Sequence, residues 1–169
     1  MYFTGYHGTN KESADAILND KGFLISKGEE HWLGDGIYFY PDFGDALNWK
    51  YEASDSEVEA VLHTIIRVED DEYLDLDNEE AKKLFRRLLD ELANSADVKP
   101  TGIQRNQNAV CKAIWEKTPK LRLMMASFPR EKTKYPAMID TREKRKEFCI
   151  RDNSCIVYLS KIERGEIHD

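Results

Sequence analysis

The residues whose types and spacing could do chemistry are a histidine near the start of the chain and a pair of aromatic residues further along. His7 lies in the segment YHGT and is followed by Gly8, while Tyr38 lies in WLGDGIYFY. A glycine at such a position lets a ligand approach the backbone closely. Trp49 follows Tyr38 by eleven positions. Two aromatic planes with exposed backbone amides suit a flat ring that carries an amide, and the cationic ring of nicotinamide is such a ligand.

Each of these residues is also compatible with a simpler role. Tyr38 and Trp49 taken alone would be assigned to the core, and His7 alone would be assigned a structural role. The order and spacing of the whole set are what indicate a binding site.

The first half of the chain predicts the elements that hold these residues. A strand over 1–7 precedes a helix for which Thr9 or Asn10 is a suitable cap and which Gly22 ends. The apolar face expected for this helix contains Ala14, Ile17 and Leu18. The next segments predict a strand, a loop, a strand, a helix and a strand over 23–26, 27–36, 36–40, 42–54 and 58–68.

The second half contains the clearest helix, over 78–95, with Asn78 as its expected cap. Its apolar residues recur at helical spacing and are Ala81, Leu84, Phe85, Leu88, Leu89 and Leu92. Beyond it the pattern predicts a loop over 99–108, a helix over 109–117, a strand over 121–127, and two strands within 146–163 separated by Asp152 and Asn153.

This arrangement indicates an α+β fold. Strands are concentrated at both ends of the chain and helices in the middle, without the β-α-β-α alternation of a doubly wound sheet. A length of 169 residues fits a single domain, 1–169, with a helical insertion roughly over 78–118.

Composition favours a cytoplasmic protein that does not enter a membrane. No apolar run is long enough for a transmembrane helix, and the first residues lack the basic flank and apolar run of a signal peptide. The three cysteines include no C-x-x-C pair, and Cys149 and Cys155 lie in apolar stretches where core positions are expected.

Charge is distributed unevenly along the chain, whose net charge is −7. Residues 1–77 carry 18 acids and 5 bases, whereas residues 112–147 carry 11 bases and 5 acids. This pattern fits two solvated faces of opposite sign. It also fits a basic segment, 112–146, that contacts an anionic partner.

The segments YHGT, GFLIS and WLGDGIYFYPDFGDALNW, in this order, resemble the catalytic domain of the poly(ADP-ribose) polymerase family, of the H-Y-E type. That family belongs to the wider diphtheria-toxin-like group of ADP-ribosyltransferases. Its pattern has a His-Gly-Ser/Thr strand, then a helix and loop, then a G-x-G-I-Y-F strand with an aromatic residue eleven positions after the tyrosine. Here the tyrosine is Tyr38 and the aromatic residue is Trp49. The resemblance covers roughly the first fifty residues closely.

The family's third element is a glutamate that opens a late strand, and two positions could supply it. EFCIRDNSCI matches the family's E-Y-I-V-Y-D with Glu147 at the acidic position. NSCIVY matches N-E-Y-I-V-Y with Ser154 at that position. We prefer Glu147, which keeps a carboxylate, although it could also be a solvated partner of Lys144 or Arg151.

The resemblance implies two packed antiparallel or mixed sheets that form an NAD cleft with flanking helices. NAD would be the substrate, and no metal would be needed. His7 and Thr9 would bind the adenosine ribose, the Gly8 backbone would hold the carboxamide, and Tyr38 and Trp49 would stack on the nicotinamide. Glu147 would stabilise the positive charge of the transition state. One departure from the family is Ala46, where a serine is usual three residues before the stacking aromatic.

The expected function is NAD-dependent mono-ADP-ribosylation of a macromolecular acceptor by a toxin or antiviral effector, which could have an antitoxin partner. A protein acceptor is slightly favoured over RNA or DNA, for which the basic segment 112–146 is the candidate contact. The alternatives are a non-catalytic module that binds NAD or ADP-ribose and, ranked last because the first half is acidic, an enzyme related to RNA 2′-phosphotransferases.

Overall fold

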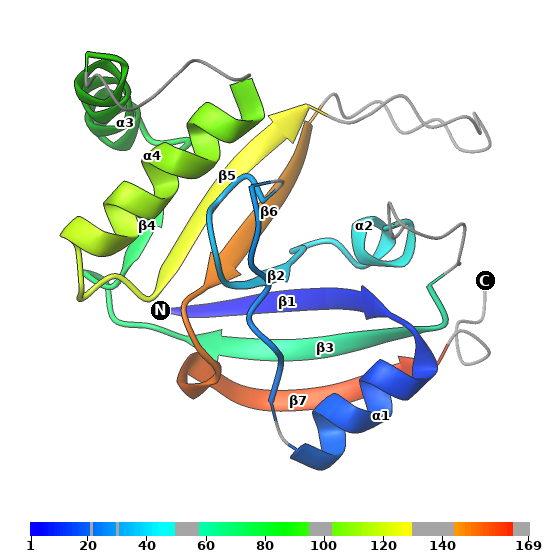
Figure 1. Cartoon of the computed structure of the whole chain (residues 1–169). Coiled ribbons are helices and arrows are strands. Elements are labelled where there is room, and N and C mark those ends of the chain that lie inside the picture. The colour runs from blue at the N-terminus through cyan, green and yellow to red at the C-terminus, as the bar shows by residue number, and fades with distance from the viewer. Residues whose placement is uncertain (21, 30, 50–57, 95–102, 130–143, 164–169) are drawn as a thin grey trace.

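Two β-sheets form the centre of the molecule (Figure 1). The computed structural model describes residues 1–20, 22–29, 31–49, 58–94, 103–129 and 144–163. In this part of the chain one sheet has the strand order β1-β3-β7 and the other has the order β2-β6-β5-β4. The α+β class predicted from the sequence is therefore confirmed.

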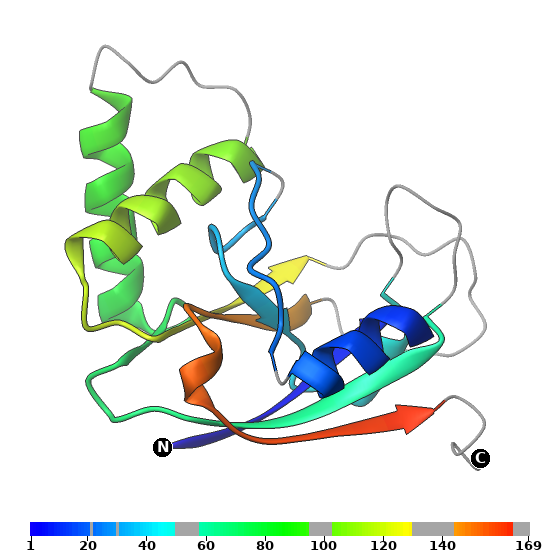
Figure 2. The same cartoon turned by 60° about the horizontal axis from the view of Figure 1, so that its bottom comes forward.

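The three-stranded sheet is antiparallel and combines both ends of the chain. β1 (Tyr2–Thr9) and β7 (Ile156–Glu163) both pair with the central strand β3 (Ala60–Arg67). β3 is rich in β-branched residues, which fit a pleated surface. α1 (Lys11–Asp20) crosses β3 and β7 on one side of this sheet (Figure 2). Asn10 is the cap of α1, because its side-chain oxygen accepts the Ser13 N–H at 2.7 Å.

The four-stranded sheet is mixed. β2 (Ile37–Phe39) and β5 (Leu123–Pro129) lie on either side of β6 (Lys144–Ile150) and are antiparallel to it, while β4 (Tyr73–Asp75) is parallel to β5. Parallel neighbours need a crossover connection, and α3 (Glu79–Ala93) and α4 (Ile103–Lys117) lie within it. Asn78 caps α3 through the Glu80 N–H at 2.9 Å. None of the helices in the described residues is long and apolar enough to cross a bilayer.

A backbone bridge between Tyr6 and Tyr40 joins the two sheets. Each residue donates its N–H to the other's carbonyl, at 2.7 and 2.8 Å. An apolar core fills the space behind the bridge and includes Leu62 and Ile66 from one sheet and Phe39 and Phe148 from the other. A second core lies between α3, α4 and the opposite face of the four-stranded sheet. The three cysteines are buried and free.

Three predicted elements differ from those observed. The helix expected over 42–54 is α2 (Phe43–Leu47), with residues 50–57 outside the described residues. The prediction of a loop over 99–108 is wrong in its second half, because α4 already begins at Ile103. This segment is polar but helix-compatible, so the lack of apolar periodicity hid the helix.

The strand expected over 23–26 is reduced to one bridge, between Ser26 and Gly36. The backbone of Phe23 is instead bound by the Asn153 side chain. The Asn153 oxygen accepts the Phe23 N–H at 2.7 Å, and the Asn153 amide donates to the Phe23 carbonyl at 2.9 Å. These bonds take the place of a neighbouring strand.

Candidate functional site

His7 lies at the junction of the two sheets. Its Nδ1 is 2.8 Å from the backbone carbonyl oxygen of Tyr38. Because a carbonyl only accepts hydrogen bonds, Nδ1 must carry the hydrogen, and Nε2 is an acceptor in the neutral ring. The ring contacts Phe23 and Phe39 edge-on, at centroid distances of 5.2 and 6.0 Å. Burial lowers the pKa of His7, although the bond to Tyr38 opposes the shift, so the ring is neutral at physiological pH.

Tyr38 is a fixed aromatic plane on β2. Its hydroxyl accepts the Leu33 N–H at 2.9 Å and donates to the Gly34 carbonyl at 2.6 Å. Burial raises the pKa of Tyr38 far above its usual range, so the hydroxyl stays protonated. The His31 ring lies 5.2 Å from the Tyr38 ring with a tilt of 33°. Tyr38 is therefore suited to contacting a planar ligand and not to transferring a proton.

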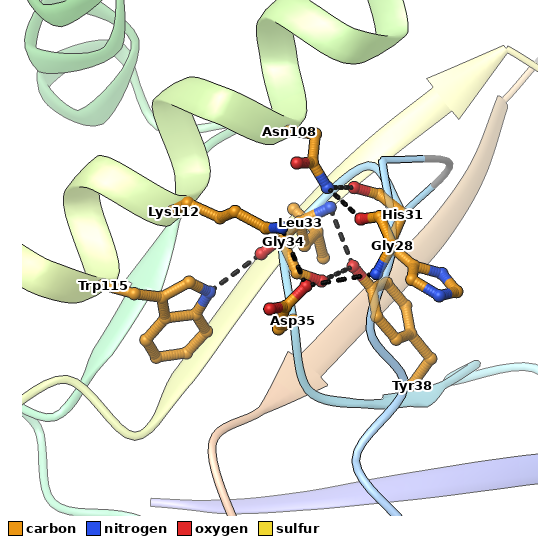
Figure 3. Close-up of polar contacts among 9 residues, drawn as sticks. All are labelled: Gly28, His31, Leu33, Gly34, Asp35, Tyr38, Asn108, Lys112 and Trp115. Carbon is orange, nitrogen blue, oxygen red and sulfur yellow. Dashed lines mark hydrogen bonds and ion pairs between the residues drawn. The ribbon is translucent and has the colours of Figure 1, made fainter.

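The loop that carries these contacts is attached to α4 by a buried asparagine (Figure 3). Asn108 is 3% exposed, and its side-chain amide donates to the carbonyls of Gly28 at 3.0 Å and His31 at 2.5 Å. Two carbonyls of an otherwise irregular segment are thereby satisfied by one side chain. The position of His31 beside Tyr38 depends on this contact.

Two further residues of α4 hold the same loop. The Trp115 indole donates to the Leu33 carbonyl at 2.8 Å, and Lys112 pairs with Asp35 at 3.0 Å (Figure 3). Burial alone would raise the pKa of Asp35, but Lys112 and a backbone N–H outweigh it and lower the pKa. Gly34 adopts a φ of +84° with Trp115 against it, so a side chain at this position would be strained. α4 thus forms the support for the loop before β2.

Glu147 lies on β6, the strand next to β2. Cys149 is the partner of Tyr38 in the ladder, which makes Glu147 a diagonal neighbour of Tyr38 on the same face. Glu147 is 5% exposed, and both Nε and Nη2 of Arg145 donate to its Oε1, at 2.9 and 2.6 Å. Burial raises the pKa of Glu147, and Arg145 acts in the opposite direction. The Arg145 guanidinium also lies 4.9 Å from the centre of the Tyr40 ring.

Gly8 is in close contact with α2. A Cβ at this position would lie 2.0 Å from the Ala46 carbonyl oxygen, so only glycine fits. Tyr6 directs its N–H and carbonyl to Tyr40, and the alternation of a strand turns the backbone groups of Gly8 to the same side. Thr9 is 1% exposed at the end of β1, and its carbonyl accepts the Glu59 N–H at 3.0 Å.

Trp49 lies beside Tyr40, two positions after Tyr38. Its indole N–H, which can only donate, binds the Tyr40 hydroxyl and lowers the Tyr40 pKa slightly, while burial raises that pKa by more. The ring also packs against an apolar cluster of Ala46, Val58 and Val61. Tyr40 contacts both Trp49 and Arg145, the partner of Glu147, so Trp49 lies close to the Glu147 side of the site.

Ser154, the alternative to Glu147, lies elsewhere. It is exposed in the short 3-10 turn Asn153–Cys155 that connects β6 to β7. Its N–H donates to Asp152 at 2.8 Å, and its hydroxyl contacts Arg122. Among the two candidates, Glu147 is the one on the strand paired with β2.

Sequence reasoning missed three residues of this site. Arg145 and Tyr40 each lie two positions from a residue that was singled out, on the same face of a strand, and this spacing could have indicated both. Asn108 gave no local signal, because its polar neighbours resemble a loop.

The basic segment 112–146 is largely neutralised where the structure describes it. Residues 130–143 lie outside the described residues. Most of the other basic side chains are within ion-pair distance of a carboxylate, namely Lys112, Lys117, Lys120, Arg122, Arg145 and Lys146. These side chains do not form an open cationic face. The described residues also contain no group of three or more His, Cys, Asp or Glu that could hold a metal ion.

Comparison with known proteins identifies no activity. No protein-family model matches the chain. The chain is 37% identical over 87 residues to an uncharacterized protein of Methanocaldococcus jannaschii. The similar region covers 48% of this chain and 41% of that protein, so the chain spans less than half the length of this relative. The function is therefore argued from the chemistry of the site.

Proposed function

We propose that the chain is an NAD-dependent mono-ADP-ribosyltransferase with the ADP-ribosyltransferase fold. The observation that carries the proposal is the arrangement of His7, Tyr38 and Glu147. These residues come from separate strands, yet His7 is hydrogen-bonded to the Tyr38 backbone and Glu147 lies on the strand paired with that of Tyr38. The order of the elements and the two adjoining sheets support the fold assignment, because the resemblance implies a cleft between two such sheets.

The proposed binding roles use groups that this geometry makes available. Nε2 of His7 accepts a hydrogen bond from a ribose hydroxyl, since Nδ1 is already a donor to Tyr38. The Tyr38 ring contacts the nicotinamide, and the Gly8 backbone binds its carboxamide. Trp49 closes the aromatic site next to Tyr40. Thr9, being buried, acts by supporting the end of β1.

The proposed chemistry depends on the Glu147 carboxylate. The bond between the ribose anomeric carbon and the nicotinamide nitrogen breaks, and its electron pair leaves with nicotinamide, which becomes neutral. Positive charge develops on the ribose, and a buried carboxylate stabilises it better than water does. A nucleophile of the acceptor then forms the new bond to the anomeric carbon and loses its proton.

A binding module without catalysis is the second candidate. Glu147 is almost fully buried and already engaged by Arg145, as a structural ion pair would be. A module of this kind would bind NAD or ADP-ribose without releasing nicotinamide. The relation to RNA 2′-phosphotransferases remains the weakest alternative, because most basic side chains described in segment 112–146 are paired with acids.

The experiment that tests the proposal is incubation with NAD labelled in its adenylate half, together with a cell lysate. Transfer of label to macromolecules, absent with Glu147→Gln, supports the enzyme. Loss of the label on protease treatment identifies a protein acceptor, and loss on nuclease treatment identifies RNA or DNA. NAD binding in calorimetry without nicotinamide release supports the binding module. No binding at millimolar NAD would overturn both candidates.

A further inference from the structure

Arg145 and Glu147 form an ion pair whose carboxylate is almost fully buried. The two residues are separated by one position on β6, so their side chains lie on the same face. The side chain of Glu147 is 6% exposed and that of Arg145 is 30% exposed. Both donating nitrogens of Arg145 bind one oxygen, Oε1, at 2.9 and 2.6 Å. Oε2 is left without a bond to Arg145.

Apart from Arg145, the described groups that act on Glu147 do not favour its charge. Ala126, opposite on β5, is apolar. Two described charged groups act on the Glu147 carboxyl, Arg145 on the same strand and Asp45 on α2, while Tyr38, Tyr40 and Cys149 beside it are neutral because burial raises the pKa of each. Arg145 is the cation in this set, and Asp45 is a second carboxylate. A carboxyl group in such surroundings takes up a proton unless a cation opposes it.

The guanidinium is itself held in place. It lies over the Tyr40 ring at 4.9 Å, and a planar guanidinium stacks on an aromatic face in a way that an ammonium group does not. Tyr40 is in turn fixed to Tyr6 by two backbone bonds. The orientation of Arg145 is therefore set by the junction of the two sheets.

We propose that Arg145 is a positioning residue for Glu147, which it keeps ionised and fixed by binding Oε1, leaving Oε2 for the ribose of the substrate. This inference rests on the proposed function, in which Glu147 meets the developing positive charge. Arg145 does not touch the substrate and acts only through Glu147.

The test compares Arg145→Gln and Arg145→Lys with a matched control, Arg67→Gln. Arg67 also binds a glutamate two positions away, Glu69, at 3.1 Å, but both side chains are exposed. The Glu147 carboxyl is titrated by carbon NMR in the protein without substrate. Its pKa is expected to rise by about one to three units in Arg145→Gln and by less in Arg145→Lys. Arg67→Gln is expected to leave it unchanged.

A second readout is the pH profile of nicotinamide release. The acid limb of kcat/KM, which reports ionisation in the free enzyme, is expected to move to higher pH in Arg145→Gln by the same amount as the Glu147 pKa. An unchanged Glu147 pKa in either folded Arg145 variant overturns the inference, as does a shifted pKa with an unmoved acid limb. Arg145→Lys keeps a positive charge, and the same titration is carried out on it if Arg145→Gln does not fold. If the wild type releases no nicotinamide, the proposed enzyme fails, while the titration still decides whether Arg145 controls the charge of Glu147.

Discussion

The imidazole of His7 and the backbone carbonyl of Tyr38 are joined by a 2.8 Å hydrogen bond that crosses from one β-sheet to the other. The bond lies beside the Tyr6–Tyr40 bridge, so the side chain of His7 is positioned by the same backbone that carries Tyr38. The position of a ligand bound to Nε2 of His7 is therefore fixed relative to β2, the strand that carries Tyr38. Two binding groups that are far apart in the sequence act as one rigid unit.

Glu147→Gln is expected to reduce nicotinamide release on the order of a hundredfold while NAD affinity stays similar, because it removes charge and keeps size. Ser154→Ala is the comparison and should have a mild effect, since Ser154 lies in an exposed turn. Steady-state turnover and calorimetry measure the two quantities. Loss of activity in Ser154→Ala with retention in Glu147→Gln would reverse the assignment.

Trp49 fluorescence is expected to change on addition of NAD or nicotinamide, because the indole is bonded to Tyr40 near the proposed site. Trp32 and Trp115 contribute background fluorescence, since the Trp32 ring contacts Phe128 at a tilt of 33° and the Trp115 indole N–H donates to the Leu33 carbonyl. Trp49→Phe should abolish the change. A change that persists in Trp49→Phe would show that the ligand acts on another part of the chain.

Gly8→Ala is expected to lower the free energy of unfolding by about 2 kcal/mol or more, because the added Cβ would lie 2.0 Å from a backbone oxygen. It should also prevent NAD binding by displacing α2. Gly44→Ala, within α2, meets only the Asp42 side chain at 3.1 Å and should change stability by about 1 kcal/mol or less. Urea unfolding measures both variants, and equal stabilities would contradict the contact.

Asn108→Ala is expected to cost about 1–3 kcal/mol of stability, because the Gly28 carbonyl loses the amide that binds it and the His31 carbonyl keeps only the longer bond from the Gly34 N–H, at 3.2 Å. The effect should be local, with faster hydrogen exchange in the loop before β2. Lys117→Ala on the same helix removes only an exposed ion pair with Glu91 and should leave the loop protected. Unchanged exchange in Asn108→Ala would mean that the loop is held without this residue.

Acid is expected to destabilise the protein through His7. Burial lowers its pKa below the ordinary 6.5, so the unfolded chain binds a proton more readily than the folded chain. The stability contributed by the neutral ring is thus present above pH 6.5 and falls as the pH drops below it, by at most about 1.4 kcal/mol per pH unit.

His7→Asn keeps a donor near the position of Nδ1 but does not titrate. Urea unfolding at two pH values on either side of 6.5 should therefore show a smaller pH dependence in His7→Asn than in the wild type. Glu147 titrates with the opposite sign, since its pKa is raised, and it is common to both proteins. An equal pH dependence in both would show that the titration of His7 does not contribute to the acid sensitivity.

The elements that the sequence predicted well are those with a strong local pattern. The helix expected over 78–95 has its cap at Asn78 and buries Ala81 and Leu88, as its periodicity indicated. The strand containing His7 and the strand containing Tyr38 were likewise found from short motifs. Here the apolar spacing and the fold agree, so local reasoning was sufficient.

The features that were missed depend on residues distant in the sequence. The Asn153 side chain binds the backbone of Phe23, and the Asn108 side chain binds the carbonyl of Gly28. The residues adjacent to each asparagine in the sequence give no indication of these partners. The pairing of Glu147 with Arg145 could have been inferred from their spacing, but their burial could not. Contacts of this kind are decided by tertiary packing, which a single sequence does not display.

The strand order β2-β6-β5-β4 has a consequence for synthesis on the ribosome. β6 lies between β2 and β5, so these strands have no common neighbour until β6 has emerged. β7, which completes the other sheet, emerges later still. His7 and Tyr38 are translated early, but they meet Glu147 only when nearly all of the described chain is available. We expect ribosome-bound chains that stop before residue 144 to lack both the completed sheet and any activity that depends on it.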